Sequence, residues 1–416
     1  MTWLSKGSLA VLDQTLFAGT NFIVNILLAR WLSTAEYGAF AVAFAVLLLI
    51  GAIHTACITE PMMVFGPEKY LPHFRKYLGV LLWGHFALML PAAFLLMLAG
   101  VIATHLDSPR VGPALIGAGI ALPFILLLWL ARRAFYVRLR PAWSTVGGVL
   151  YLAVLLTTVD LLRRTAWFSP AIALIGMGIG ALAVSALLLC LLQPSLGSNS
   201  GEPTVKQVAI EHWRYGRWSL ATVGTNWFPS NIYYVILPAW LGLGDAGALR
   251  ALMNLAMPVL HSNSALSMVL MPTLVLDRHR AGRAAMNRTI RFHLLLLFSG
   301  SFVYLIVLLT CHGTLLRLLY GDKYSAYGLF PLLVVGLLPF GSAATMILGN
   351  GLRALGKPDR IFWCYAAATL ATVVLGIPLV FALGVPGALI GLFLSGMTTS
   401  ISMLWFYQRP AQGEAR

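Results

Sequence analysis

The sequence predicts an all-α protein that crosses a lipid bilayer twelve times, and three observations lead to this fold class. Of the 416 residues, 59% are hydrophobic and only 10% are charged, whereas soluble proteins carry about 25% charged residues. Apolar runs of roughly 20 residues, long enough to cross about 30 Å of hydrocarbon as a helix, recur along the chain. The runs are continuous and do not alternate, which excludes a membrane β-barrel.

Polar, basic or proline-containing breaks separate the twelve expected helices. They cover residues 8–30, 38–60, 78–102, 113–131, 143–162, 170–192, 217–241, 246–272, 291–312, 329–351, 361–382 and 386–407.

The distribution of basic residues supports this count. With the N-terminus inside, 21 of the 28 Lys and Arg residues fall on the inner side and six on the outer side. Cytoplasmic connections are enriched in Lys and Arg, so both termini are predicted to be cytoplasmic. The same bias explains the formal charge of +15 without nucleic-acid binding. The exception is Arg163 and Arg164 on the outside, with Asp160 as a nearby partner.

The polar segment 193–212 has the composition of a linker, with Pro194, Pro203 and several Gly, Ser and Asn residues. It divides the chain into an N-terminal lobe of six helices, residues 1–192, and a C-terminal lobe of six helices, residues 213–416. An even number of helices per lobe gives both lobes the same orientation, so they are expected to form a parallel repeat about the membrane normal.

A weak internal repeat supports the two lobes. At an offset of 209 residues the pattern W-L-x-x-x-[ED]-x-G-A occurs twice, beginning at Trp31 and at Trp240. Each copy follows the first helix of its lobe. A second similarity lies in the basic, proline-containing connections 132–141 and 353–360.

Amide side chains recur on the first helix of each lobe. Gln14, Asn21 and Asn25 share one face of the first helix because seven and four residues separate them. Asn226 and Asn231 lie on the seventh helix. Such stripes fit a polar central cleft between the lobes, and the alternative is hydrogen bonding between helices without a cavity.

Arg250 is predicted one turn inside the eighth helix. A guanidinium at that depth requires an anion, either a carboxylate or a ligand phosphate; the alternative is a side chain that extends to the outer surface. Arg30 ends the first helix near the same side, where interfacial extension is favoured.

Other titratable groups lie within the expected helices. Asp13 and Glu60 are candidates for ion coupling, because carboxylates in a low dielectric can titrate near neutral pH. Among the intramembrane histidines, His54 and His261 are the candidate cavity residues, because they lie on helices that correspond in the repeat. Interfacial charges and structural hydrogen bonds are the alternatives for all four.

No enzymatic constellation is present. The sequence contains no Walker A pattern, metal-binding spacing or nucleophile elbow, so neither a resident cofactor nor ATP hydrolysis by this chain is expected. The four cysteines lie in apolar runs and predict neither a metal site nor a disulfide framework. The first residues show no cleavable signal peptide.

Four short motifs in order resemble polysaccharide flippases of the multidrug/oligosaccharidyl-lipid/polysaccharide exporter superfamily, and the similarity covers essentially the whole chain. They are Leu28-Ala29-Arg30-Trp31-Leu32 with Glu36-Tyr37-Gly38, Leu319-Tyr320-Gly321-Asp322-Lys323-Tyr324, Arg353-Ala354-Leu355-Gly356-Lys357-Pro358 and Gly384-Val385-Pro386-Gly387-Ala388.

The resemblance implies a flippase of the bacterial inner membrane that moves undecaprenyl-pyrophosphate-linked oligosaccharide by alternating access, without ATP. A proton or sodium gradient would drive it, and glycosyltransferases and a polymerase would be its pathway partners. In the related lipid II flippases, arginines of the first and eighth helices line the cavity, which implies that Arg30 and Arg250 contact the pyrophosphate. The sequence lacks the two additional C-terminal helices of lipid II flippases, which favours O-antigen or exopolysaccharide substrates. The alternatives are a cation-coupled multidrug exporter of the same fold, a lipid II flippase and a scaffold that does not transport.

Overall fold

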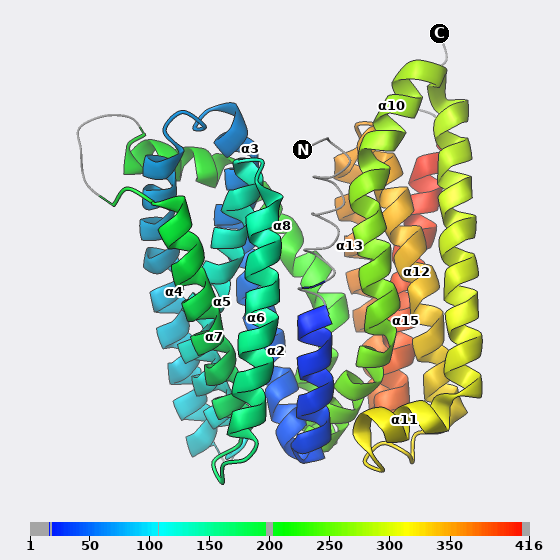
Figure 1. Cartoon of the computed structure of the whole chain (residues 1–416). Coiled ribbons are helices and arrows are strands. Elements are labelled where there is room, and N and C mark those ends of the chain that lie inside the picture. Colours follow the sequence, from blue (N-terminus) through cyan, green and yellow to red (C-terminus); the bar gives the residue numbers. More distant parts are fainter. Residues whose placement is uncertain (1–15, 17–18, 107, 197–202, 410–416) are drawn as a thin grey trace. The chain divides into compact units, whose positions relative to one another are not determined.

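The computed structural model describes residues 16, 19–106, 108–196 and 203–409 (Figure 1). Two predicted site residues, Asp13 and Gln14, lie outside the described residues. The described part contains helices, turns and connecting segments and no strand. Nine of its helices are long and apolar enough to cross a membrane. The predicted all-α, multi-pass membrane fold is confirmed, and the twelve-helix count is compatible with the structure.

The described residues form two compact units that divide between Gly224 and Thr225, and the short segment Asn25–Arg30 groups with the second unit. The predicted lobe boundaries themselves stay a prediction. A first helix covers residues 19–31, and apart from residues 25–30 it belongs to the first unit. The first unit also holds α2 Thr34–His54, the π-helical turn η1 Thr55–Thr59, α3 Glu60–Glu68, α4 Phe74–His105, α5 Val111–Val137, α6 Pro141–Leu162, α7 Pro170–Leu192 and the first part of α8 Val205–Asn231.

The second unit continues α8 and contains the remaining helices. They are α9 Tyr233–Trp240, α10 Leu243–Thr310, α11 His312–Tyr320, α12 Leu329–Ala354, α13 Pro358–Ala371, the π-helical turn η2 Thr372–Gly376, α14 Ile377–Leu383 and α15 Val385–Gln408.

The segment 193–212, predicted as a linker, is helical from Val205 onward. Here Val208 and His212 face inward while Val205 and Trp213 are 60% exposed, which is an amphipathic pattern. The single helix predicted at 217–241 is divided at Ile232 into α8 and α9. In α10, Gly282 has a φ of +76°, and this non-helical residue separates the two predicted helices 246–272 and 291–312.

The repeat places its two breaks at equivalent residues. The first helix ends at Trp31 and α2 begins at Thr34, while α9 ends at Trp240 and α10 begins at Leu243. Both boundaries are offset by the same 209 residues that the sequence pattern predicts. In the first copy, Ser33 caps α2: its hydroxyl accepts from the Glu36 amide, and the Glu36 carboxylate accepts from the Ser33 amide. This capping box ends the first helix and starts the second.

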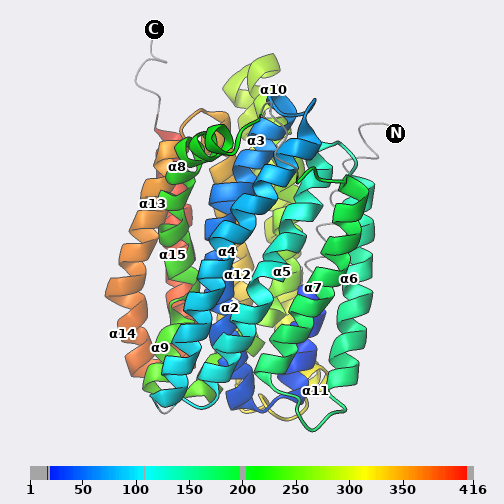
Figure 2. The ribbon, with the colours of Figure 1, turned by 90° about the vertical axis from the view of Figure 1, so that its left-hand side faces the viewer.

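Small residues allow the helices of the first unit to approach closely. In this unit α5 packs against both α4 and α7 (Figure 2). A Cβ added at Gly117 would lie 2.6 Å from the Ala171 carbonyl oxygen, and one added at Gly178 would lie 2.7 Å from the Ala121 Cα. Close backbone contact replaces the hydrophobic effect as the source of helix association in lipid.

The second unit is built around α12, which packs against α10 and α15, while α13 also packs against α15. A cluster that includes Leu274, Met286, Ile347 and Met403 forms its apolar core. Several large apolar side chains remain on the surface; Leu295 is 69% exposed and Phe302 is 56% exposed. Such exposure fits a helix that faces lipid rather than water.

Candidate functional site

Arg250 is buried in the first part of α10, with 6% of its surface exposed. Its Nε donates a hydrogen bond to Oδ1 of Asn25 at 3.1 Å, and its guanidinium lies 5.8 Å from the centre of the Tyr234 ring. Asn25 is 3% exposed and belongs to the same unit. Because an amide oxygen is neutral, this bond orients the guanidinium without neutralising its positive charge.

Arg30 lies at the exposed end of the first helix. Its Nη1 donates to the Leu318 carbonyl at 3.2 Å, and Lys323 Nζ donates to the Arg30 carbonyl at 2.6 Å. Five residues along a helix separate Asn25 from Arg30 by about 7.5 Å along the axis and about 140° around it. Arg30 therefore lies on a different face of the first helix from Asn25, the partner of Arg250, and the exposure of Arg30 fits an interfacial side chain.

A cavity of about 410 Å³ lies within the second unit, between α8, α10, α12, α13 and α15. Asn226, one of the predicted cavity residues, lines it. Asn231 does not, and its Nδ2 donates to the Trp227 carbonyl one turn earlier at 3.1 Å.

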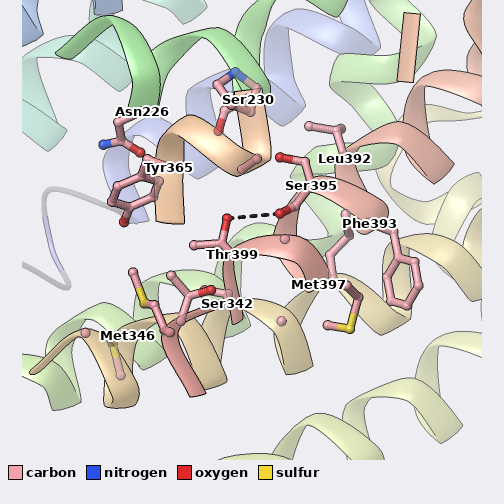
Figure 3. Close-up of a pocket in the computed structure, with 18 of the residues that line it drawn as sticks. Asn226, Ser230, Ser342, Met346, Tyr365, Leu392, Phe393, Ser395, Met397 and Thr399 are labelled. Atoms are coloured by element: carbon pink, nitrogen blue, oxygen red, sulfur yellow. Dashed lines mark hydrogen bonds between the residues drawn. The ribbon is translucent and has the colours of Figure 1, made fainter. Parts of the chain in front are cut away.

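Hydroxyl groups dominate the polar lining of this cavity (Figure 3). The hydrogen-bonding side chains around it are Asn226, Ser230, Ser342, Thr345, Arg353, Tyr365, Ser395 and Thr399. No Asp or Glu is among the described residues that line it. The two serine and threonine stripes, on α12 and on α15, repeat at three or four residues. That helical spacing is a signal that the sequence analysis did not use.

Asn21 borders a second, much smaller cavity of about 30 Å³ in the first unit, next to Phe44, Trp129 and Tyr151. A volume of roughly 10–15 Å³ suffices to hold a single water molecule. This space can therefore hold water but not a substrate.

His54 is fully buried in the first unit, where its Nε2 lies 3.0 Å from Nδ1 of His85. His85 Nε2 lies 3.0 Å from the Pro123 carbonyl. A carbonyl can only accept, so His85 carries its proton on Nε2 and accepts from His54 Nε2. The chain of bonds ties α2 to α4 and α5. His54 Nδ1 has no hydrogen-bond partner among the described residues.

The repeat equivalent of His54 at the offset of 209 is Asn263 rather than His261. Asn263 is 1% exposed, and its Nδ2 donates to the Pro339 carbonyl at 3.3 Å. In both units the side chain at this position is therefore hydrogen-bonded to a proline carbonyl on the fourth helix of its lobe. Asn263 makes this bond directly, and His54 makes it through His85. His261 is half-buried and does not lie at the equivalent position, although its helix corresponds to that of His54.

Glu60 begins α3 directly after the π-helical turn η1. Its Oε1 accepts from the Tyr215 hydroxyl at 3.4 Å. Beside it, the guanidinium of Arg133 donates to the Thr59 hydroxyl. Arg133 was not among the predicted site residues. π-Helical turns are rare overall, and those that occur are often found at functional sites. Glu60 therefore remains a candidate for ion coupling.

A second set of charges in the first unit joins the loop after α3 to the start of α8. Lys69 Nζ lies 2.5 Å from Glu211 Oε1, and the Tyr70 hydroxyl donates to Glu211 Oε2 at 2.6 Å. Burial alone would raise the pKa of Glu211, but the bonds from Lys69 and Tyr70 outweigh it and the pKa is lowered. Burial and the bond to Glu211 raise the pKa of Tyr70 to about 12.

Among the described residues, no group of three His, Cys, Asp or Glu side chains could hold a metal ion. The four cysteines are free.

Comparison with known proteins places this geometry in a structural class. No protein-family model matches the chain. The succinoglycan biosynthesis transport protein ExoT of Rhizobium meliloti is 27% identical over 298 residues, which cover 67% of this chain and 56% of the relative. The match therefore spans little more than half the length of that curated relative.

Solved transporters share the fold over nearly the whole chain. The lipid II flippase MurJ in an inward closed conformation has a TM-score of 0.78 at 12% identity, with 97% of this chain and 87% of MurJ covered. An inward-facing multidrug resistance MATE transporter of the MOP superfamily has a TM-score of 0.71 at 14% identity, with 94% and 93% covered. The chain therefore shares its fold with these transporters.

The resemblance to polysaccharide flippases of this superfamily, predicted from four short motifs, is thereby confirmed. ExoT is named a succinoglycan biosynthesis transport protein, and the two solved structures are named a lipid II flippase and a multidrug resistance transporter. All of them are transport proteins rather than enzymes, in agreement with the sequence prediction.

Proposed function

We propose that this protein is a flippase that moves undecaprenyl-pyrophosphate-linked oligosaccharide across the bacterial inner membrane by alternating access, without ATP. Three observations support the proposal: the MOP fold, the relative named for succinoglycan transport, and the buried cation Arg250. Both termini would lie in the cytoplasm, as the distribution of Lys and Arg predicts. The lipid-linked oligosaccharide and the bilayer are the direct partners, and glycosyltransferases and a polymerase belong to the same proposed pathway.

Arg250 is the observation that carries the proposal. Its guanidinium is buried, and Asn25 holds it through a neutral amide oxygen. A planar guanidinium in such a position is the side chain that most often recognises phosphate groups in proteins. A pyrophosphate supplies several acceptor oxygens in the geometry that a guanidinium prefers. Arg250 would therefore bind the pyrophosphate, Arg30 would meet it at the membrane interface, and the prenyl chain would stay in the lipid.

The experiment compares three variants for polymer export in a strain that depends on this protein. Arg250→Ala removes the cation. Asn25→Asp keeps Arg250 but places a carboxylate about 3 Å from the guanidinium, which would compete with the pyrophosphate. Both variants should lose export while the protein remains in the membrane. Arg317→Ala is the matched control, because Arg317 lies in the same unit with 75% of its side chain exposed.

A charged hydrogen bond is worth about 1.5–3 kcal/mol, so the affinity of Arg250→Ala for undecaprenyl pyrophosphate should fall about 10- to 100-fold. Normal export by Arg250→Ala, or equal loss in Arg317→Ala, would contradict the role of Arg250. Loss of the protein itself from the membrane in both Arg250→Ala and Asn25→Asp would instead assign the pair to folding.

The alternative of a cation-coupled drug exporter makes a different prediction. Cationic drugs favour acidic side chains in the binding cavity, and the described lining of the large cavity contains none. Drug susceptibility of cells that overproduce the protein separates the two proposals, because only the exporter would raise resistance. Coupling to a proton or sodium gradient through Glu60 belongs to both.

A further inference from the structure

We infer that the cavity inside the second unit is a subsite for one uncharged sugar ring of the transported glycan. The inference rests on the proposed function and adds to it the place where the carbohydrate is recognised. The phosphate-binding role of Arg250 is separate, because Arg250 is not among the residues that line the cavity.

The first argument is the chemistry of the walls. Asn226, Ser230, Ser342, Ser395 and Tyr365 all face this space, and none of these five side chains has a hydrogen-bond partner among the described residues. A polar group inside a membrane protein is costly when it has no partner. Ser395 is buried, Ser342 and Tyr365 are half-buried, and Asn226 and Ser230 are exposed. Water or a ligand that can both donate and accept would therefore satisfy these groups.

The second argument excludes other ligands. A cation would require carboxylates, and none lines the cavity in the described part of the chain. A phosphate would require several cations, whereas Arg353 is the one basic residue in the described lining, and its Nη1 donates to Oδ1 of Asn350 at 3.1 Å. Neutral hydroxyl and amide groups match the hydroxyls of a sugar, because each partner can donate and accept.

The third argument is size and apolar surface. Small-molecule sites occupy about 300–1,000 Å³, and this cavity, at about 410 Å³, falls near the lower end. It suits one ring of a glycan rather than a whole oligosaccharide. Met346, Met397 and Phe393 also line it, and their flexible or flat apolar surfaces can pack against the C–H faces of a sugar ring.

Gly396 provides a way to fill the cavity without disturbing the fold. It lines the space on α15, and a Cβ added there would meet nothing within 4 Å. Gly396→Leu therefore occupies the cavity with a side chain that clashes with no neighbour at its first atom. Gly300→Leu is the matched control, because Gly300 is exposed on α10, lines no part of this cavity and also has nothing within 4 Å of an added Cβ.

The test measures binding of two probes to the purified full-length protein in lipid nanodiscs. One probe is undecaprenyl pyrophosphate without sugar, and the other is the lipid-linked oligosaccharide extracted from an export-blocked strain of the protein's own host. We expect wild type and Gly300→Leu to bind the glycan-bearing probe about tenfold more tightly than the bare lipid. Gly396→Leu should bind both probes equally, with unchanged affinity for undecaprenyl pyrophosphate. The double variant Ser342→Ala/Ser395→Ala should lose most of the same preference without filling the space.

A preference for the glycan that survives in Gly396→Leu, or its absence in the wild type, would overturn the sugar subsite while the flippase proposal stands. Failure of the wild type to bind either probe would overturn the flippase proposal and the subsite with it. Unchanged binding of undecaprenyl pyrophosphate by Gly396→Leu shows in the same experiment that the variant is folded.

Discussion

Substitution of Gly376 by Ala is the most direct test of the packing in the second unit. The Tyr233 hydroxyl of α9 lies in a notch between Gly376 of η2 and Gly391 of α15. A Cβ added at Gly376 would lie 2.1 Å from the Tyr233 oxygen and 3.3 Å from Cζ of the same ring, and one added at Gly391 would lie 2.2 Å from the oxygen and 2.8 Å from Cζ. Both oxygen distances are far below van der Waals contact, so the ring or a helix must move.

The distances also predict which clash can be relieved. Overpacking a well-packed core costs about 1–3 kcal/mol, and we expect both Gly376→Ala and Gly391→Ala to fall in that range. Tyr233→Phe removes the hydroxyl oxygen. At position 376 the nearest remaining ring atom is then 3.3 Å away, which small adjustments can accommodate, whereas at position 391 it is still 2.8 Å away. Tyr233→Phe should therefore rescue Gly376→Ala and rescue Gly391→Ala much less.

Thermal unfolding of the purified protein in detergent, followed by intrinsic fluorescence, measures both effects. For a unit of about 200 residues, 1 kcal/mol corresponds to a shift in Tm of about 2–4 °C. A double-mutant cycle with the Tyr233→Phe single variant subtracts the effect of losing the hydroxyl itself. An unchanged Tm in Gly376→Ala, or equal rescue at both glycines, would refute the notch as described.

Three further predictions concern the first unit. Ser33→Ala removes the cap of α2 and should cost about 1 kcal/mol, measured as a fall in Tm, whereas Ser33→Asp retains an acceptor and should cost less; equal losses would argue against capping. His85→Leu leaves the Pro123 carbonyl and His54 Nε2 without their partner and should lower the free energy of unfolding by about 1–3 kcal/mol for each buried group left unpaired. The double variant His54→Leu/His85→Leu should lower it by less than the sum of the two single variants. The pKa of Glu211 is lowered in the folded protein, so its bonds to Lys69 and Tyr70 stabilise the fold above the ordinary glutamate pKa of about 4.3, and this stabilisation disappears as the pH falls through the lowered pKa. The Tm of wild type should therefore converge with that of Glu211→Gln at acid pH. A constant difference between the two Tm values from pH 7 to pH 3 would contradict this role.

The sequence predicted those helices whose position depends on neighbouring residues in the chain. Seven of the predicted spans agree with the observed helices to within a few residues at most ends, because an apolar run of bilayer length can form little else in lipid. The start of α7 at Pro170 illustrates this: a proline in the first turn follows Ser169, whose hydroxyl accepts from the Ile172 amide, and both signals are readable from the chain.

The elements that the sequence analysis missed have weaker local signals. The start of α8 at Val205 follows glycine, serine and proline residues, and its inward face is set by tertiary bonds such as that from Tyr77 to His212 at 2.7 Å. The π-helical turns at Thr55–Thr59 and Thr372–Gly376 depend on one inserted residue in the helical register, which composition does not reveal. The short helix α11 is too short to register as an apolar span.

The candidate site shows the same division. Intramembrane cost alone identified Arg250 and Asn25 as unusual residues, but only the fold shows that they contact each other. The sequence analysis related His54 to His261 because their helices correspond, whereas the offset of 209 assigns Asn263 to that position, two residues from His261. The sequence analysis did not identify the hydroxyl groups of the large cavity, because a single serine or threonine adds little to the free energy of inserting a helix into the membrane.

The repeat explains why the two units can differ in function while sharing a backbone plan. Equivalent breaks at Trp31 and Trp240 fix the same helix boundaries in both, and the side chains near them are not equivalent: at the offset of 209, Arg250 corresponds to Ala41 and Arg30 to Ala239. A symmetric cargo would favour equivalent cations in both halves. A lipid-linked glycan has one charged pyrophosphate, one apolar chain and one polar glycan, so its recognition requires different chemistry at different places. If the cargo is the proposed lipid-linked glycan, the buried guanidinium of Arg250 and, elsewhere in the same unit, a cavity lined mainly by hydroxyl groups would meet that requirement.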